Sequence, residues 1–315
     1  VRPGTTLRAG LSLLPRGRTA QPVVAAIELA AGATVGAYRV IERLGEGGMG
    51  TVYTVEHKVL GRRHALKVLR PGLVEGERDA ADRFLREARA AARIHHANIV
   101  DVYDFGHLRD GRPYFVMELL SGESLADRVD RGPLAPSEAI AIIRQLADAL
   151  AAAHDCGVIH ADVTPGNAFL VGDGSVAKLL DFGLAELVGE TVRDETNNFV
   201  LGTPSYISPE QLLGLAATDR SDQYSLGVVL FELLAGRPPY VNADLRQLCL
   251  AHVNAPIPDV MSKFGPLPPK LIDLVTTCLQ KSPQARFPGM RAVLAALDEV
   301  EQVTDRSGWR RWLSR

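Results

Sequence analysis

The chain has 315 residues, which is enough to bury a large core and to form two lobes or domains. Its 35 basic and 37 acidic residues leave a net charge of −2, so the composition does not favour nucleic acid as a partner. The three cysteines are an odd number without metal-site spacing, and no apolar run approaches a membrane span, which together favour a cytoplasmic protein with reduced thiols.

The N-terminal residues 1–33 are rich in Ala, Gly and Pro. Their one apolar patch is too brief for a secretory signal, so we expect a flexible leader. Regular structure should begin near Thr34, and Tyr38–Ile41 has the pattern of the start of a strand.

A glycine-rich string, Leu44 to Tyr53, follows this strand. Gly45, Gly47 and Gly50 form the pattern G-x-G-x-x-G, which also occurs between a strand and a helix in dinucleotide-binding sites. Here alternating β-branched and aromatic residues follow the glycines, so a second strand, and therefore a hairpin, is predicted. A hairpin tip without side chains lets backbone N–H groups approach phosphates closely. Taken alone, the pattern is a weak signal, because any glycine-rich hairpin can match it.

Two further strands and a helix are predicted before residue 121. His64–Leu69 forms a short strand that contains Lys67, and Tyr114–Leu120 has the composition of a buried strand. Residues 77–94 show one apolar face, which is typical of an amphipathic helix, and they include Glu87. Taken individually, both charged residues are equally well explained as solvated surface groups.

Three oxygen-bearing side chains occur in a fixed order within residues 158–184: Asp162, Asn167 and Asp181. A Pro-Gly turn separates the first two, and a Gly-Asp-Gly hairpin signal precedes the third. We therefore expect a loop, a short hairpin and a second loop that present the three side chains at one end. Carboxylate and amide oxygens suit Mg²⁺ that shares phosphate oxygens with a nucleotide.

Two long helices flank this stretch in the sequence. Ser137–Cys156 has helical apolar periodicity and is followed by Gly157, which favours a helix end. Asp222 precedes the almost wholly apolar run Gln223–Ala235, which ends at Gly236. A carboxylate at such a position favours an N-cap, and a second role is considered below.

Taken in order, these motifs resemble those of protein kinases, and most closely the eukaryotic-like Ser/Thr protein kinases of bacteria. The resemblance extends to Leu201–Gln211, where Ser208-Pro209-Glu210 replaces A-P-E at the end of an activation segment. It also implies that Arg286 pairs with Glu210, and that Asp222 holds the backbone of the catalytic loop.

The resemblance implies an α+β, bilobal protein-kinase fold. Its kinase domain would span 34–300, with a small β-rich lobe containing one key helix at 34–118 and a larger, mainly helical lobe at 119–300. Residues 301–315 would form a basic, Trp-containing tail.

The resemblance further implies ATP and Mg²⁺ as ligands and assigns roles to individual residues. Asp162 would accept the proton of the substrate hydroxyl, while Asn167 and Asp181 would hold Mg²⁺. Lys67, paired with Glu87, would bind the α- and β-phosphates. The full set of implied catalytic residues is Asp162, Lys67, Glu87, Thr164 and Thr203. The implied nucleotide contacts are Leu44, Gly45, Glu46, Gly47, Gly48, Met49, Gly50, Thr51, Val52, Ala65, Lys67, Met117, Glu118 and Leu120.

Two positions depart from the family pattern. Ala161 replaces the Arg that binds a phosphorylated activation loop, for which Thr191 and Thr196 are the candidate acceptors here. Thr164 replaces the Lys that contacts the γ-phosphate. Two alternatives therefore stay open: a weakly active or inactive pseudokinase scaffold that binds nucleotide, and a small-molecule phosphotransferase on the same fold. The intact catalytic residues argue against the first, and the complete segment from Gly202 to Gln211 argues against the second.

The expected function is ATP-dependent phosphoryl transfer to Ser/Thr hydroxyls of proteins, including autophosphorylation, in intracellular signalling. Ser/Thr specificity is favoured because Thr203 matches the residue typical of Ser/Thr kinases. The expected partners are protein substrates, without nucleic acid. A homodimer is a further alternative, and so is a weak membrane or partner contact through the C-terminal tail.

Overall fold

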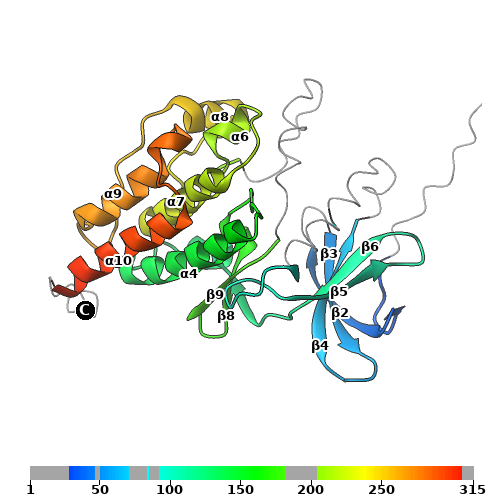
Figure 1. Ribbon diagram of the computed structural model, residues 1–315. Helices are drawn as coiled ribbons and strands as arrows, with labels where there is room; N and C mark the ends of the chain where they lie inside the picture. The colour runs from blue at the N-terminus through cyan, green and yellow to red at the C-terminus, as the bar shows by residue number, and fades with distance from the viewer. Residues whose placement is uncertain (1–27, 47–49, 71–83, 85–91, 182–203, 307–315) are drawn as a thin grey trace, which may run out of the picture.

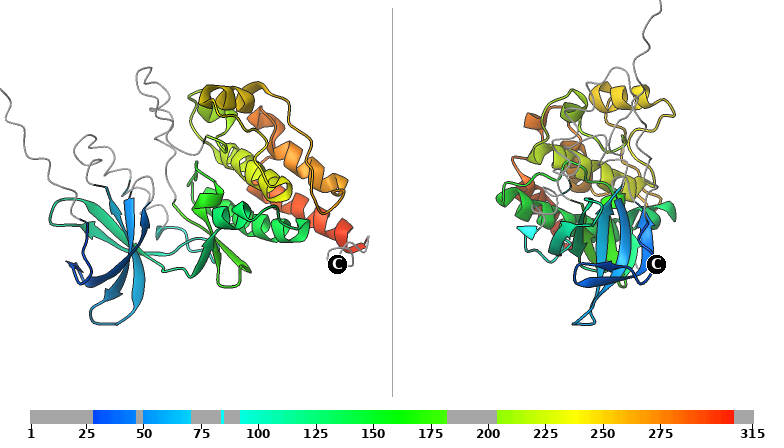
Figure 2. Two further views of the ribbon diagram at one scale, coloured as in Figure 1. Left: turned by 180° about the vertical axis from the view of Figure 1, so that it is seen from behind. Right: turned by 90° about the vertical axis from the view of Figure 1, so that its right-hand side faces the viewer.

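A computed structural model describes residues 28–46, 50–70, 84, 92–181 and 204–306 of the chain (Figure 1). The tip of the glycine-rich hairpin, most of the helix predicted at 77–94 and the end of the tail lie outside these residues. Figures 1 and 2 show a twisted sheet on one side and a group of helices on the other, with a small sheet between them. This arrangement confirms the bilobal α+β fold predicted from the motifs.

The smaller lobe is a six-stranded antiparallel sheet in the order β1-β2-β3-β4-β6-β5. Its strands are β1 (Thr34–Val35), β2 (Tyr38–Glu46), β3 (Gly50–His57), β4 (Arg63–Leu69), β5 (Val102–His107) and β6 (Pro113–Met117). Side chains such as Val40, Val55 and Leu66 alternate onto one face and form its core. Leu29 and Ala33 also pack there, so regular packing begins a few residues before the predicted start at Thr34.

The larger lobe combines the small antiparallel sheet β7-β8-β9 with helices. Its elements are β7 (Gly122–Ser124), α3 (Leu125–Asp130), α4 (Pro136–Asp155), η1 (Pro165–Asn167), β8 (Ala168–Val171), β9 (Val176–Leu179), α6 (Pro209–Leu212), α7 (Asp219–Ala235), α8 (Leu245–Asn254), α9 (Pro269–Cys278), η2 (Pro283–Ala285) and α10 (Met290–Arg306). The predicted long helix and the hairpin around Gly172–Gly174 are present as α4 and β8-β9. Within the described residues, no helix has both the length and the apolar character needed to cross a membrane.

The helix α7 is the centre of this lobe, because every residue from Ser221 to Leu234 is buried. Gly227 allows it to lie close to α9, since a Cβ there would stand 2.6 Å from the Cβ of Cys278. α7 ends at Gly236, whose φ of +77° gives the predicted left-handed cap.

The predicted N-cap role of Asp222 is wrong. α7 begins four residues earlier than expected, at Asp219, and its N-cap is Thr218, whose side chain accepts a hydrogen bond from the backbone of Arg220. Asp222 therefore lies inside the first turns of the helix, where its carboxylate is available for another role.

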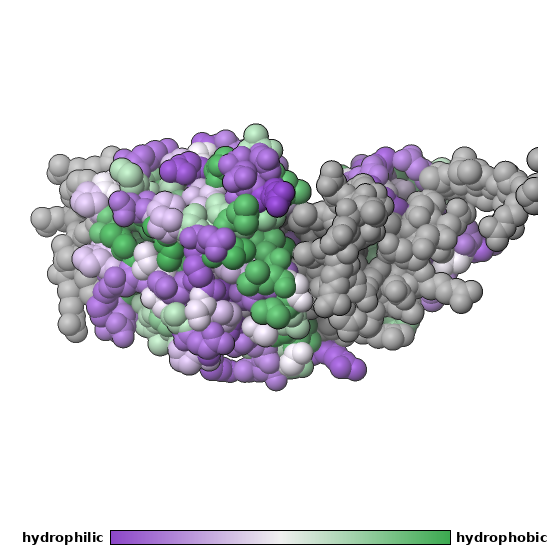
Figure 3. All heavy atoms as spheres, turned by 90° about the horizontal axis from the view of Figure 1, so that it is seen from above, coloured by the Kyte–Doolittle hydropathy of each residue, from purple (hydrophilic) through white to green (hydrophobic). Residues whose placement is uncertain are grey.

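Apolar side chains reach the surface of the larger lobe around α6 and α8. Figure 3, which views the molecule from above, shows apolar surface on this side of the lobe. Leu213, Leu215 and Leu250 are 64%, 58% and 45% exposed, respectively. Exposed apolar side chains gathered on one side of a protein are a feature of surfaces that contact other proteins.

Candidate active site

The loop between α4 and β8, residues 156–167, contains the first two of the three predicted oxygen-bearing side chains. α4 ends where Gly157 adopts a φ of +72°. The chain then passes through Asp162 into the 3-10 turn η1, which Pro165 begins and Asn167 completes. The predicted turn between the two side chains is therefore present.

Asp222 holds the backbone of this loop, as the resemblance implied. Its fully buried carboxylate accepts hydrogen bonds from the backbone N–H of His160 at 3.0 Å and of Ala161 at 2.8 Å. It also accepts one from Nε2 of His154, on α4, at 2.7 Å. Ala161 has a φ of +64°, a left-handed conformation that a residue with a Cβ keeps only where its surroundings hold it.

His160 connects this loop to the one that carries Asp181. Its Nδ1 accepts a hydrogen bond from the backbone N–H of Asp162 at 3.3 Å, and its Nε2 donates to the carbonyl of Leu180 at 2.9 Å. One neutral tautomer, with the proton on Nε2, satisfies both contacts. The backbone N–H of Leu180 also donates to the carbonyl of Asn167 at 2.8 Å. The two loops are therefore fixed relative to each other.

Asp162 and Asn167 form a directly bonded pair. Nδ2 of Asn167 donates to Oδ2 of Asp162 at 2.8 Å and to its carbonyl at 2.9 Å. Burial raises the pKa of Asp162 above its ordinary value, and the negative charges of Asp181 and Asp222 raise it further. These effects outweigh the electrostatic influence of His160 and the hydrogen bond from Asn167, which both lower the pKa.

Thr164 caps the turn η1. It is 5% exposed, and its Oγ1 accepts a hydrogen bond from the backbone N–H of Asn167 at 3.3 Å. Its side chain therefore helps to define the turn that orients Asn167. Thr203, the other threonine implied to be catalytic, lies outside the described residues.

Lys67 and Asp181 form an ion pair that joins the two lobes. Nζ of Lys67 lies 2.6 Å from Oδ1 of Asp181, and the side chain of Lys67 is only 7% exposed. Nζ also lies 5.6 Å from the centre of the Phe115 ring, on the neighbouring strand β6. Asp181 has a φ of +52°, which places its carboxylate at a sharp bend in the chain. Glu87, the partner implied for Lys67, lies outside the described residues.

The donor atoms at this site suit a hard divalent cation shared with a nucleotide. Asn167 uses its NH₂ group for Asp162, which leaves its amide oxygen, with the carboxylate of Asp181, as the candidate metal donors. In the part of the chain that is described, no group of three or more His, Cys, Asp or Glu residues could hold a metal by itself. Two protein oxygens fit Mg²⁺, which keeps several waters and binds substrate phosphates.

The strands of the smaller lobe bring together the residues predicted to contact the nucleotide. Ala65 pairs with Met117 across β4 and β6, and Val52 pairs with Lys67 across β3 and β4. Gly50 needs its lack of a side chain, because a Cβ there would stand 2.6 Å from the carbonyl of Val68. The described part of the glycine-rich segment comprises Leu44, Gly45, Glu46, Gly50, Thr51 and Val52, while Gly47, Gly48 and Met49 lie outside the described residues.

The connection between the lobes begins at Glu118. Its backbone N–H donates to the carbonyl of Asp101 at 2.9 Å, so this N–H is not available to a ligand. Its side chain accepts a hydrogen bond from Nζ of Lys178, on β9, at 2.7 Å. The carbonyl of Glu118 and the backbone of Leu120 are therefore the polar groups that this connection can offer to a base.

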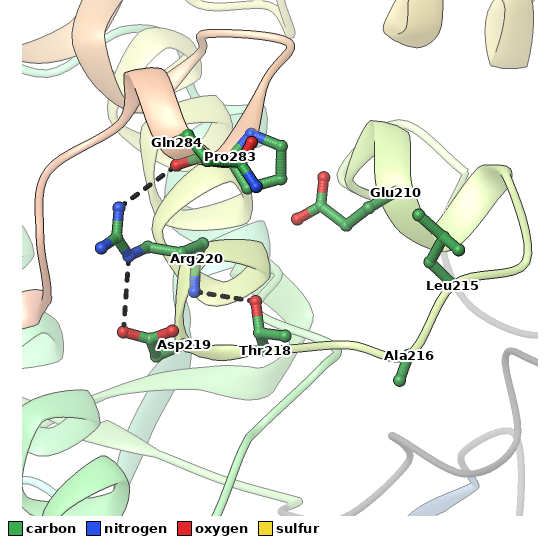
Figure 4. Close-up of a pocket in the computed structure, with 8 residues that line it drawn as sticks. All are labelled: Glu210, Leu215, Ala216, Thr218, Asp219, Arg220, Pro283 and Gln284. Atoms are coloured by element: carbon green, nitrogen blue, oxygen red, sulfur yellow. Dashed lines mark hydrogen bonds and ion pairs between the residues drawn. The ribbon is translucent and has the colours of Figure 1, made fainter.

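The predicted pair of Glu210 and Arg286 is present and buried. Nη1 and Nη2 of Arg286 donate to the two carboxylate oxygens at 2.7 and 2.8 Å. Burial alone would raise the pKa of Glu210, but the hydrogen bonds and charge of Arg286 hold it below its ordinary value. Glu210 lines a hollow of about 610 Å³. Figure 4 shows it across this hollow from Pro283 and Gln284. The pair anchors α6 to the end of the larger lobe.

Three residues that contact the site were not singled out from the sequence. They are His154, which contacts Asp222, Lys178, which contacts Glu118, and Gln211, whose Nε2 donates to the carbonyl of Ala161 at 3.0 Å. For Gln211 a signal was available, because Ser208 and Gln211 have the spacing of a capping box. That signal predicts its contact with Ser208 but not its reach to the catalytic loop.

Comparison with known proteins gives consistent matches over most of the chain. A family model described as "Protein kinase domain" matches residues 38–296. The serine/threonine-protein kinase Pkn1 of Myxococcus xanthus is 38% identical over 294 residues, which cover 92% of this chain and 42% of that protein. PrkC of Bacillus subtilis, also a serine/threonine-protein kinase, is 37% identical over 80% of this chain and 38% of that protein.

Solved structures agree with these matches. A crystal structure of the PknI kinase domain from Mycobacterium tuberculosis, a double mutant, superposes with a TM-score of 0.69 at 30% identity. The match covers 87% of this chain and 99% of that domain. The chain thus spans a whole solved domain but less than half the length of Pkn1 or PrkC.

Proposed function

Because this chain belongs to the protein kinase domain family, we propose that it transfers the γ-phosphoryl group of ATP to Ser and Thr hydroxyls of proteins, itself included. The observation that carries the proposal is the meeting of two pairs, Lys67 with Asp181 and Asp162 with Asn167. The contacts of His160 hold the loops of these pairs in one arrangement.

In the proposed reaction Asp162 orients the substrate hydroxyl and accepts its proton as the oxygen attacks phosphorus. Nδ2 of Asn167 fixes one carboxylate oxygen of Asp162, so the other oxygen is directed to the hydroxyl. Lys67 binds the α- and β-phosphates from the sheet of the smaller lobe. When bound, Mg²⁺ would be held by Asn167 and Asp181 and would neutralise charge on the phosphates. Such a site acts mainly through positioning and electrostatic stabilisation.

The nucleotide is proposed to lie between the glycine-rich strands and the connection between the lobes. Ala65 and Met117, paired across the sheet, would flank the adenine ring. The carbonyl of Glu118 and the backbone of Leu120 would bind its polar edge. The glycine-rich hairpin, from Leu44 to Val52, would cover the phosphates with backbone N–H groups.

Proteins are the proposed substrate class, and Ser/Thr the proposed acceptors. The named relatives are serine/threonine-protein kinases. The anchored segment from Ser208 to Gln211 and the exposed apolar side chains near α6 suit contact with a polypeptide better than with a small molecule. The intact Asp162 and Lys67 favour an active enzyme over a nucleotide-binding scaffold.

The test is transfer of radiolabelled γ-phosphate from ATP to a generic protein and to the chain itself. We expect transfer that needs Mg²⁺ and that is lost in Asp162→Asn, with phosphoserine and phosphothreonine as the products. Chelation of the metal should stop transfer without lowering the melting temperature. Nucleotide binding without any transfer would overturn the proposal in favour of the scaffold.

A further inference from the structure

The peptide group that joins Ala161 to Asp162 is held at both of its polar atoms. Its carbonyl oxygen accepts a hydrogen bond from Nε2 of Gln211 at 3.0 Å. Its N–H, which belongs to Asp162, donates to Nδ1 of His160. The orientation of this peptide group sets the direction in which the Asp162 side chain leaves the backbone. Gln211 thus acts one residue away from the proposed proton acceptor.

The amide of Gln211 has a single allowed orientation. Its Oε1 accepts hydrogen bonds from the backbone N–H of Ser208 at 3.2 Å and from the Ser208 hydroxyl at 2.8 Å. Since both of these donors need an oxygen acceptor, Nε2 must be the atom that faces the carbonyl of Ala161. Gln211 is 1% exposed and Ser208 is fully buried, so water does not compete for these bonds.

The peptide group needs such a contact because Ala161 is in a strained conformation. A φ of +64° is unfavourable for a residue with a Cβ, and the methyl side chain of Ala161 makes no hydrogen bonds. Hydrogen bonds to its backbone must therefore stabilise this conformation. Asp222 holds its N–H, and Gln211 holds its carbonyl. Two buried side chains, one from α7 and one from α6, therefore determine the bend.

We propose that Gln211 is a positioning residue, which aligns Asp162 by holding the carbonyl of Ala161 and so connects the segment that ends at α6 directly to the catalytic loop. The connection consists of buried neutral hydrogen bonds and needs no phosphate group. This inference rests on the proposed phosphoryl transfer.

The test uses Gln211→Glu, with Gln211→Met beside it. An ionised carboxylate still accepts both hydrogen bonds from Ser208 but cannot donate to Ala161, and it replaces that contact with repulsion between two acceptor oxygens. We expect kcat to fall by about 10- to 100-fold, as for small misplacements of reacting groups, while the KM for ATP stays within about twofold. Gln211→Met should lose as much activity.

The dependence on pH separates positioning from a general structural defect. A protonated carboxyl donates through its O–H, so the kcat of Gln211→Glu relative to wild type should recover as the pH is lowered. The ratio for Gln211→Met should stay constant, because Met does not titrate. The control is Gln284→Glu, the same change at an exposed glutamine of the larger lobe, whose Oε1 accepts a hydrogen bond from the Ser282 hydroxyl at 2.8 Å. It should keep its kcat within about twofold, because surface substitutions usually have small effects.

Hydrogen exchange gives a readout that does not depend on activity. The backbone amides of residues 158–167 should exchange faster in Gln211→Glu and Gln211→Met than in wild type or Gln284→Glu. Unchanged exchange and unchanged kcat in both Gln211 variants would overturn the inference. A wild-type chain that transfers no phosphate would instead overturn the proposed function, and the exchange result would still decide the role of Gln211.

Discussion

Replacing Asp222 by Asn should weaken both the fold and the reaction, because the carboxylate is fully buried and makes three hydrogen bonds. The new amide oxygen can still accept from Ala161 at the position of Oδ1. The new NH₂ group replaces Oδ2, and there it faces two donors, the backbone N–H of His160 and Nε2 of His154. Both of these bonds are lost in the geometry observed.

A change of tautomer at His154 does not rescue the variant. Moving its proton to Nδ1 would allow Nε2 to accept from the new amide, but Nδ1 is buried and has no hydrogen-bond partner among the residues that the structure describes. Hydrogen bonds to a charged group are worth about 1.5–3 kcal/mol each, and the relief of a buried charge offsets part of the loss. We therefore expect the free energy of unfolding to fall by about 3 kcal/mol, equivalent to roughly 6–12 °C in melting temperature.

The assay combines thermal melting with phosphate transfer measured well below the melting temperature. Transfer should fall by about 100-fold, because a loop held by fewer contacts misplaces Asp162. Asp219→Asn is the matched control: it lies on the first turn of the same helix, its side chain is 38% exposed, and its contact with Arg220 is 3.6 Å long. It should melt within about 2 °C of wild type, since exposed ion pairs contribute little. If Asp222→Asn behaves like this control, the three buried bonds do not stabilise the loop.

Four further predictions concern the proposed site. Lys67→Met should greatly reduce transfer, and it should melt at the wild-type temperature because an apolar side chain of similar volume keeps the packing against β6. Undiminished transfer would remove Lys67 from the mechanism. Asp181→Asn should lose far more activity than Asp173→Asn, since Asp173 lies on the exposed β8-β9 turn, and equal losses would contradict the metal assignment. Burial raises the pKa of Asp162, so the ionised form is disfavoured in the folded state, and Asp162→Asn should raise the melting temperature at pH 7 while abolishing transfer. The difference in melting temperature should shrink as the pH falls through that raised pKa, because the wild-type carboxyl then becomes protonated. Transfer by wild type should fall over the same range. A difference in melting temperature that does not change with pH would refute burial of the charge as the cause. Thr164→Lys should keep or raise transfer, because the added charge would lie near the γ-phosphate. Loss of the cap on η1 should lower the free energy of unfolding by about 1 kcal/mol. An inactive wild type that this change does not rescue would favour the nucleotide-binding scaffold.

The order of motifs predicted the lobes, the family and the positions of Lys67, Asp162 and Asp181 on their strands and loops. These features depend on local patterns, such as the Gly-rich turns and the apolar periodicity of α4, which a sequence reports directly. The start of α7 was missed because Thr218 satisfies the same capping requirement four residues before Asp222. Propensity does not distinguish two cap candidates one helical turn apart, whereas packing of the helix does.

Contacts between distant segments were not predictable from periodicity. The hydrogen bond from Gln211 to Ala161 joins residues 50 positions apart, and its existence depends on how α6 docks onto the larger lobe. Likewise, charge alone allows Lys67 to pair with either Glu87 or Asp181. The fold brings Oδ1 of Asp181 to 2.6 Å from Nζ of Lys67. Polar side chains that act through the backbone of another segment leave little trace in sequence patterns.

Hydrogen bonds join β9 to the segment that leads into β5, and this has a consequence for domain movement. Ile99 forms a parallel bridge with Leu179, and Nζ of Lys178 donates both to the carbonyl of Ile99 and to the side chain of Glu118. The β8-β9 hairpin must therefore travel with the edge of the smaller lobe whenever the two lobes rotate. Since β2 and β3 lie towards the opposite edge of the sheet from β5, we expect the glycine-rich strands to move further than this edge when the lobes rotate.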